Sequence, residues 1–363
     1  KNDLSKVVVG TGPFYLAQVS QEKLVFKKNQ NYRDEFYPSA GDRYANTQDL
    51  LTSSTERLPF LERVVFYFID DEERRWEAFI DGKIDILSVP KKFLVKITEG
   101  DPDIEELLRQ KEIKLKHFSS ISSRWLGFNM SDPVLGKNLE LRKALAHAID
   151  YDGYIALMSN NTNLRANSIF NPGIPGYDPS HQMSYDYDLD KARAHLEKSG
   201  FSPGELTLTY TTRSNQQINY EEAEFIKNQL GKIGVNLKIN VVQFSEFLAR
   251  GRAGELQFFT DSWIYDYPDA ENLAQLLVSS NSPGINKSAY NNLQVDKLYS
   301  ELSKTLDKDK RRALMAKIEN FVDKEIPWVM LMFESSYILH YPNIKNFRKS
   351  YFIRNHLKYL KKD

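Results

Sequence analysis

The alternation of apolar and polar residues is most regular between residues 206 and 241. Leu206, Leu208 and Tyr210 alternate with polar residues, which is typical of a strand with one buried face. A helical spacing follows over 223–233, where the apolar residues are Ala223, Ile226, Leu230 and Ile233. Strict alternation then resumes over 235–241. This order predicts a strand, a crossover helix and a second strand that runs parallel to the first.

The same patterns predict strands and helices on both sides of this unit. The stretch 61–69 is apolar on both faces, so we expect a strand covered on both sides, then a helix over 72–80 and a strand over 84–87. These three segments also predict a parallel crossover. The other predicted strands are 7–15, 24–27, parts of 113–129 and 326–333, and further helices are predicted over 141–149 and 298–322. Strands that alternate with helices predict an α/β fold.

The segment 261–269 carries three aromatic and three acidic residues directly after the apolar run 256–259. A strand that ends here would leave Trp263, Tyr265 and Asp266 at its carboxyl edge, and Pro268 would stop it from continuing. Ligands of open α/β sheets bind outside the carboxyl ends of strands. A carboxylate beside aromatic faces suits a ligand with a cation and apolar surface. The alternative is a loop whose aromatics fill the core while its acids stay in solvent.

Composition excludes several classes of function. With 363 residues the chain can form two domains, and its 49 basic residues equal its 49 acidic residues, so no global charge favours nucleic acid or an anionic membrane. The absence of cysteine excludes disulfides, thiolate catalysis and cysteine-bound zinc. No apolar run approaches the length of a membrane span. Residues 1–6 lack the apolar core of a signal peptide, so we expect any export signal to lie upstream.

The candidates for metal binding and catalysis are few. The six histidines are scattered without a pair at ligand spacing, so we expect neither a metal site nor a cofactor. His147 has apolar neighbours at helical spacing, and His195 belongs to a short amphipathic helix that would leave it exposed. Asp266 and Asp269 could form a carboxylate pair, but no second catalytic element accompanies them. We therefore predict that the protein is not an enzyme.

Several motifs occur along the chain in a fixed order. They are Val-Gly-Thr-Gly-Pro-Phe-Tyr at 9–15, Ile-Asp-Gly-Lys-Ile-Asp at 80–85, Leu-Gly-Phe-Asn at 126–129, the helix 141–150, the segment 187–200, the turn 263–269 and Ile-Pro at 326–327. In this order the chain resembles the extracellular solute-binding proteins that serve oligopeptide and dipeptide ABC transporters. One departure is that members of this family begin well before the Gly-Thr-Gly-Pro turn. We therefore expect a missing N-terminal domain or a second chain.

The resemblance implies a type II periplasmic-binding-protein clamp, in which mixed sheets flanked by helices form two lobes that close over a ligand by hinge motion. It implies lobes formed by 1–122 with 336–363 and by 123–335. The function implied is that of the substrate-binding component of an ABC importer. Such a monomer captures short peptides or similar amine-bearing solutes in the inter-lobe cleft and delivers them to a membrane permease. It would act in the periplasm or on the outer side of a bacterial cytoplasmic membrane, secreted or lipid-anchored.

The resemblance also assigns roles to individual residues. Asp266 matches the acid that pairs with a peptide's α-amino group, as a desolvated ammonium requires, so we expect it to be buried beside Trp263. Arg213 matches the position that holds the ligand carboxylate in dipeptide-binding members, and its planar guanidinium suits this task. Trp263 and Tyr265 would supply apolar walls, although Tyr265 could instead pack in the core.

Asn129 and Arg124 lie near the expected crossing between the lobes and complete the candidate ligand-binding residues. The alternatives are that Asn129 binds backbone at a strand end and that Arg124 is a surface charge. The ligand itself stays open, because relatives of this fold carry opines, sugars or nickel complexes as well as peptides. A sensor or scaffold protein that keeps the clamp without transport is the other functional class that the sequence allows.

Overall fold

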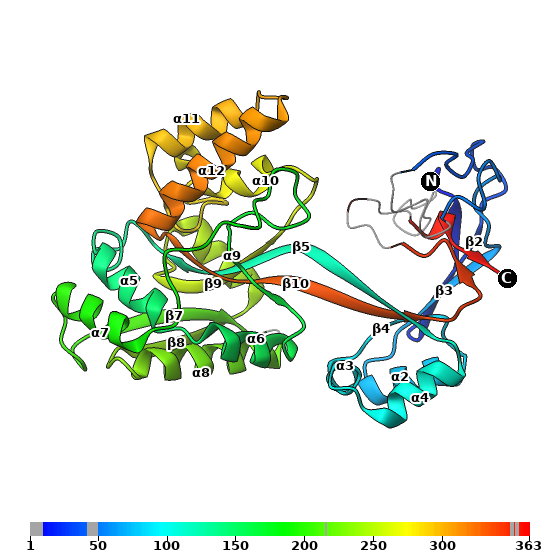
Figure 1. Ribbon diagram of the computed structural model, residues 1–363, viewed down its shortest axis with the longest axis horizontal. Helices are drawn as coiled ribbons and strands as arrows, with labels where there is room; N and C mark the ends of the chain where they lie inside the picture. Colours follow the sequence, from blue (N-terminus) through cyan, green and yellow to red (C-terminus); the bar gives the residue numbers. More distant parts are fainter. Residues whose placement is uncertain (1–9, 42–49, 215, 349–351, 353–355) are drawn as a thin grey trace, which may run out of the picture. The chain divides into compact units, whose positions relative to one another are not determined.

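The computed structural model describes residues 10–41, 50–214, 216–348, 352 and 356–363. Residues 7–9 of the first predicted strand lie outside this set. The chain divides into two compact units, Lys1–Phe118 with Ser336–Asp363 and Ser119–Ser335. Both boundaries fall inside long strands, β5 (Lys114–Phe128) and β10 (Trp328–His340) (Figure 1). We call these parts unit 1 and unit 2 and describe each by itself.

Unit 1 contains a three-stranded antiparallel sheet of β1 (Phe14–Val19), β2 (Lys23–Lys28) and β3 (Arg63–Tyr67). The strand predicted over 24–27 is confirmed by β2. The expectation that the strand over 61–69 is covered on both sides is wrong, since Phe66, Tyr67 and Phe68 are 45%, 47% and 53% exposed. The reason is that the helices of unit 1 pack around a separate apolar cluster rather than over β3.

That cluster contains Trp76 and Phe79 of α2 (Glu72–Ile80) together with Leu87 of β4 (Ile86–Ser88). Helix α2 begins after Asp71, whose carboxylate accepts a hydrogen bond from the Arg74 backbone N–H. The predicted helix and strand are therefore confirmed, but the predicted parallel crossover is wrong. Strand β4 pairs with β10 in antiparallel orientation, while β3 belongs to the other sheet. The remaining elements of unit 1 are α3 (Lys91–Thr98), α4 (Pro102–Gln110), β11 (Ile344–Lys345), η3 (His356–Tyr359) and β12 (Lys361–Lys362).

Unit 2 is built on a mixed sheet in the order β10-β5-β9-β7-β8, with the short β6 (Leu164–Arg165) beside β10. Strand β7 (Thr207–Arg213) runs parallel to both β8 (Asn236–Val242) and β9 (Phe258–Ile264), whereas β5 is antiparallel to β9. The helix α8 (Gln217–Gly231) connects β7 to β8. The parallel crossover predicted from the alternation over 206–241 is thus confirmed.

The two faces of this sheet carry separate layers of side chains. On one face Tyr210 and Phe258 pack with Ile226 of α8, and α6 (Tyr151–Ser159) lies beside α8 (Figure 1). On the other face Phe259 packs with Phe247 of α9 (Phe244–Ala253). The other helices of unit 2 are α5 (Leu139–His147), α7 (Leu189–Lys198), α10 (Glu271–Ala274), η1 (Gln275–Leu277), η2 (Ser279–Asn281), α11 (Leu293–Leu302) and α12 (Lys308–Glu325).

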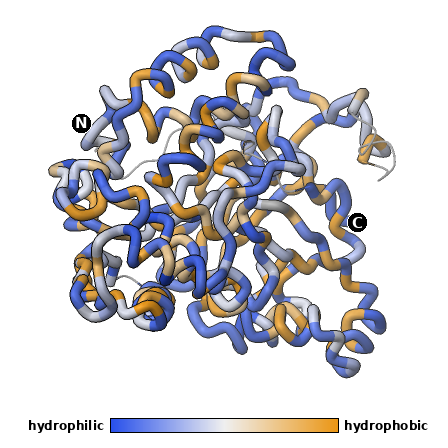
Figure 2. Tube along the Cα trace, turned by 60° about the vertical axis from the view of Figure 1, so that its left-hand side comes forward, coloured by the Kyte–Doolittle hydropathy of each residue, from blue (hydrophilic) through white to orange (hydrophobic). Residues whose placement is uncertain are grey.

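Apolar and polar residues alternate along the helices, as expected of helices that turn one face toward a core (Figure 2). Within the described residues, no helix combines the length and the apolar character that crossing a bilayer requires.

Candidate functional site

The candidate site lies at the carboxyl edge of the parallel strands of unit 2. In the parallel register of β7 and β9, Thr211 is opposite Phe259. Arg213 and Asp261 each lie two residues further along their strands, so both project to the α9 face at the same edge. Trp263 follows at the next position on that face. The expectation that the Arg213 strand and the Trp263 turn share one edge is therefore confirmed.

Trp263 and Asp266 are held together by Asn272 of α10. The indole Nε1 of Trp263 donates to Asn272 Oδ1 at 2.8 Å, and the backbone N–H of Asp266 donates to the same oxygen at 3.0 Å. Asn272 is buried, with 1% of its surface exposed. No pattern along the sequence marks Asn272, because its role comes from a turn that returns the chain to the strand end.

The Asp266 carboxylate is exposed on unit 2, with Asn272 Nδ2 at 3.5 Å from its Oδ2. The expected burial of this acid is therefore wrong for unit 2 taken by itself. The reason is that Asp266 lies in the turn beyond the end of β9, where its neighbours Tyr267 and Pro268 are exposed as well. Among the described residues the carboxylate forms no ion pair, so its charge is available to a ligand cation.

Tyr265 takes the core position that the sequence left open. It is buried, and its backbone N–H donates to the Ile121 carbonyl at 3.1 Å, next to the start of the β5–β9 pairing. Burial raises the pKa of the Tyr265 phenol above its ordinary value. In unit 2 its ring therefore fills the interior rather than a wall open to ligand.

Arg213 is partly exposed, and its guanidinium lies 5.5 Å from the ring centre of Phe247 and 6.0 Å from that of Phe244. These rings at the start of α9 orient the cation. Among the described residues Arg213 forms no ion pair with a carboxylate. Its neighbour Asp261 is instead paired with Lys287 at 2.8 Å, and both side chains are 13% exposed. Within the part of the chain that the structure describes, the positive charge of Arg213 at this edge is therefore not compensated by an ion pair.

Arg124 is not a surface charge, and it projects from the opposite face of the sheet. Its Nε and Nη2 donate to the Glu222 carboxylate at 3.0 and 2.6 Å, and Nε also lies 2.9 Å from the Tyr154 hydroxyl. Burial would lower the pKa of Arg124, but the Glu222 carboxylate and Tyr154 raise it well above its ordinary value. Arg124 pairs with Ser262 across β5 and β9, so it projects to the α6 and α8 face, opposite Arg213 and Trp263.

Asn129 lies at the other end of the sheet. Its Nδ2 donates to the Gly254 carbonyl at 2.9 Å, and its Oδ1 accepts from the Ser131 backbone N–H at 2.9 Å. The backbone-binding alternative is therefore confirmed. Phe128 pairs with Phe258 at the start of β9, so Asn129 is about 20 Å along the strand from the Trp263 end.

The residues considered for catalysis have structural partners. The rings of His147 and His195 stack with their centres 5.6 Å apart between α5 and α7. The Nδ1 of His147 lies 2.9 Å from the Asp186 carbonyl, and that of His195 lies 2.7 Å from the Glu140 carboxylate. His195 is partly buried by this packing, so its expected exposure is wrong.

The carboxylate of Asp269 is also engaged. It accepts from the Glu271 backbone N–H at 2.9 Å and pairs with Arg311 of α12. This ion pair fixes the turn after β9, whereas Asp266 forms no ion pair with a residue that the structure describes. Among the described residues, no three of the metal-ligating types His, Asp and Glu gather at one point.

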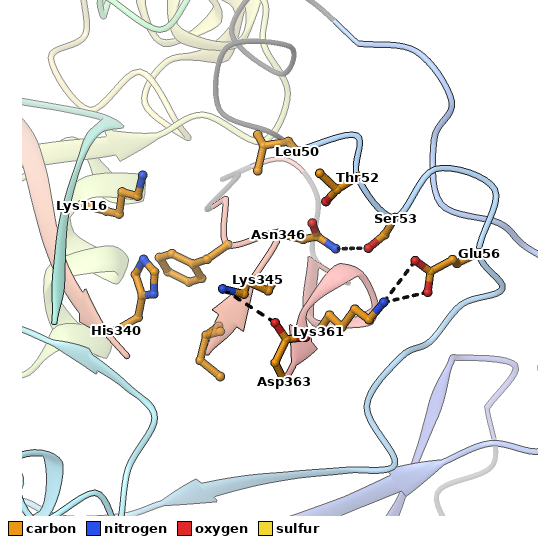
Figure 3. Close-up of a pocket in the computed structure, with 12 residues that line it drawn as sticks. Leu50, Thr52, Ser53, Glu56, Lys116, His340, Lys345, Asn346, Lys361 and Asp363 are labelled. Carbon is orange, nitrogen blue, oxygen red and sulfur yellow. Dashed lines mark hydrogen bonds and ion pairs between the residues drawn. The ribbon is translucent and has the colours of Figure 1, made fainter. Parts of the chain in front are cut away.

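A separate cavity of about 480 Å³ lies within unit 1 (Figure 3). Two ion pairs line it, Lys345 with Asp363 at 3.7 Å and Lys361 with Glu56 at 2.9 Å. These four charges neutralise each other in pairs, whereas Lys116, which also lines the cavity, forms no ion pair with a described residue.

A protein family described as bacterial extracellular solute-binding proteins, family 5 Middle, matches residues 1–284. The chain belongs to this family. This confirms the family resemblance drawn from the order of motifs.

Among the relatives of this family 5 solute-binding chain is the heme-binding protein A of Haemophilus influenzae, 24% identical over 349 residues, which are 95% of this chain and 58% of that protein. The dipeptide-binding protein of Escherichia coli is 24% identical over 328 residues, 89% of this chain and 55% of that protein. The solute-binding chain thus spans less than two thirds of the length of either relative. Both relatives are named as binding proteins, not as enzymes.

A solved structure shows the same fold. It is the ABC transporter-associated periplasmic binding protein DppA of Helicobacter pylori in complex with the peptide STSA. The TM-score is 0.73 at 26% identity, over 97% of this chain and 63% of that one. The predicted fold class of the solute-binding chain, an α/β protein of the periplasmic-binding-protein type, is therefore confirmed.

Proposed function

We propose that this chain belongs to the substrate-binding component of an ABC importer and binds a short peptide or a similar amine-bearing solute at the carboxyl edge of β7 and β9. The observation that carries the proposal is a pair of charges at that edge that form no ion pair with any described residue, the carboxylate of Asp266 and the guanidinium of Arg213, with the Trp263 indole on the same edge. The names of a dipeptide-binding relative and of a peptide complex with the same fold support it.

The arrangement suits a zwitterionic ligand. Asp266 would accept from the ligand's ammonium, Arg213 would donate to its carboxylate, and Trp263 would contact apolar atoms between them. A charge-assisted hydrogen bond contributes about 1.5–3 kcal/mol when water is excluded. Because Asp266 is exposed on unit 2, the upper part of this range requires that the bound peptide and further protein surface shield it. Delivery to a membrane permease on the outer side of the cytoplasmic membrane completes the proposed role.

The first experiment is mass spectrometry of small molecules released from freshly purified protein. A mixture of short peptides supports the proposal. If a single non-peptide solute is released, the ligand belongs to that class of compound rather than to the peptides. Chemical conversion of added peptides would indicate an enzyme. An empty site that takes up no added peptide would favour a sensor or scaffold.

The second experiment tests the amine anchor by calorimetric titration with a dipeptide and its N-acetylated form. Asp266→Asn should weaken binding of the free-amine dipeptide about tenfold or more and change binding of the acetylated form little. Asp309→Asn, which removes the same charge from the first turn of α12, is the matched control and should change neither. Equal losses for both ligands in Asp266→Asn would reject Asp266 as the anchor.

A further inference from the structure

The Asn272 amide is the point where the turn after β9 is tied back to the strand. Its Oδ1 accepts two hydrogen bonds, from Trp263 Nε1 at 2.8 Å and from the Asp266 backbone N–H at 3.0 Å. Its own backbone N–H donates to the Asp269 carbonyl at 3.1 Å, and its carbonyl accepts from Gln275 Nε2 at 2.9 Å. Both backbone and side chain of Asn272 are thus fixed, so the positions of the indole and of the Asp266 turn are coupled through one oxygen.

The two N–H groups of Trp263 and Asp266 require a neutral hydrogen-bond acceptor on a side chain as long as that of asparagine. A leucine has a similar shape but would leave the Trp263 and Asp266 N–H groups without their acceptor. An aspartate would keep the acceptor, but it would place a second negative charge about 3.5 Å from the Asp266 carboxylate, where like charges disfavour ionisation of both. Asparagine supplies the oxygen without adding a second negative charge beside the Asp266 carboxylate.

We propose that Asn272 is the positioning residue of the ligand site and that it sets the preference for ligands with a free amine. It does so by fixing the Asp266 carboxylate beside the Trp263 indole. This inference rests on the proposed function, in which Asp266 binds the ligand's ammonium. Asn272 itself need not touch the ligand, since it acts through the two groups that it holds.

The measured quantity is a selectivity ratio, the affinity for a free-amine dipeptide divided by the affinity for its N-acetylated form. Asn272→Leu should lower this ratio about tenfold, because Asp266 loses its fixed position while the apolar contacts remain. In an Asp266→Asn background, Asn272→Leu should lower the ratio no further, since both changes act on the same contact. Acrylamide quenching of tryptophan fluorescence should also increase, because Trp263 loses its acceptor.

Asn286→Leu is the matched control for a merely structural effect. Asn286 is also buried in unit 2, and its side-chain hydrogen bonds to described residues are all to backbone. Its Nδ2 donates to the Val278 and Tyr290 carbonyls at 3.1 and 2.9 Å, and its Oδ1 accepts from the Tyr290 N–H at 3.1 Å. Its replacement should lower stability by a similar amount and leave the selectivity ratio unchanged.

Asn272→Asp provides a second variant that keeps the acceptor. Acrylamide quenching of tryptophan fluorescence should stay at the wild-type level in this variant. The affinity for the free-amine dipeptide should become dependent on pH between about 5 and 8, because two carboxylates at this distance share a proton. The inference is overturned if Asp266→Asn abolishes the selectivity but Asn272→Leu retains it, or if Asn272→Asp shows the wild-type pH profile. If Asp266→Asn itself leaves the ratio unchanged, the proposed function fails instead.

Discussion

Replacing Arg124 by methionine separates a structural from a ligand-binding role for this arginine. Glu222 is 1% exposed, and its carboxylate receives both donors of the Arg124 guanidinium as well as the Tyr154 hydroxyl. Arg124→Met removes the charge partner and leaves the acid buried with the tyrosine alone. Breaking a buried ion pair in this way costs about 3–5 kcal/mol, and the remaining Tyr154 contact favours the lower end, about 3 kcal/mol.

This loss can be measured by calorimetry and by urea denaturation followed by circular dichroism. For a unit of this size, about 1 kcal/mol corresponds to a change of about 2–4 °C in Tm, so we expect a decrease of about 6–12 °C. The double variant Arg124→Met with Glu222→Leu removes both charges and should recover most of the loss. Peptide affinity, measured well below the Tm of the variant, should stay at the wild-type value.

Three results would refute this reasoning. A loss of stability below about 1 kcal/mol in Arg124→Met would show that the ion pair does not hold β5 to α8. A large loss of peptide affinity without a loss of stability would return Arg124 to the ligand site. A double variant as unstable as the single one would show that methylene packing, rather than the unpaired acid, causes the effect.

Two further predictions concern charges elsewhere in unit 2. Lys287→Met should free the Asp261 carboxylate to pair with Arg213, and so weaken binding of a dipeptide several-fold without affecting binding of a dipeptide amide. Adding Asp261→Asn to this variant should restore dipeptide binding. If calorimetric titrations show no restoration, Arg213 and Asp261 do not share the edge as described. Burial raises the pKa of Glu319, which accepts from Ser168, above its ordinary value of 4.5. The folded state therefore holds this proton more tightly than the unfolded state, and stability falls as pH rises from 4.5 through the raised pKa. Glu319→Gln should thus raise Tm at pH 7 and match the wild type near pH 4; a lower Tm at pH 7 would contradict this.

The candidate site could be predicted in part, because some of its features are local. The turn after β9 follows from an apolar run that ends before a proline, and Arg213 is placed at a strand end by the alternation over 206–210. No local pattern shows which residue each charged side chain pairs with. Arg124 meets Glu222, 98 positions away, and this contact holds it in the interior of unit 2. Asn272 gained its role only when the turn brought its amide oxygen to Trp263.

The sequence by itself determined several strands and helices, among them β2 and α2, as well as the parallel crossover between β7 and β8 and the family. It could do so because the period of apolar residues and the order of motifs are properties of the chain itself. The tertiary structure alone decided that β4 pairs with β10, that β3 stays half exposed and that Tyr265 is buried. The physical reason is that periodicity records which face of an element is apolar but not which element covers it. Pairing and burial depend on contacts between residues far apart in the chain, and these exist only once the elements have packed.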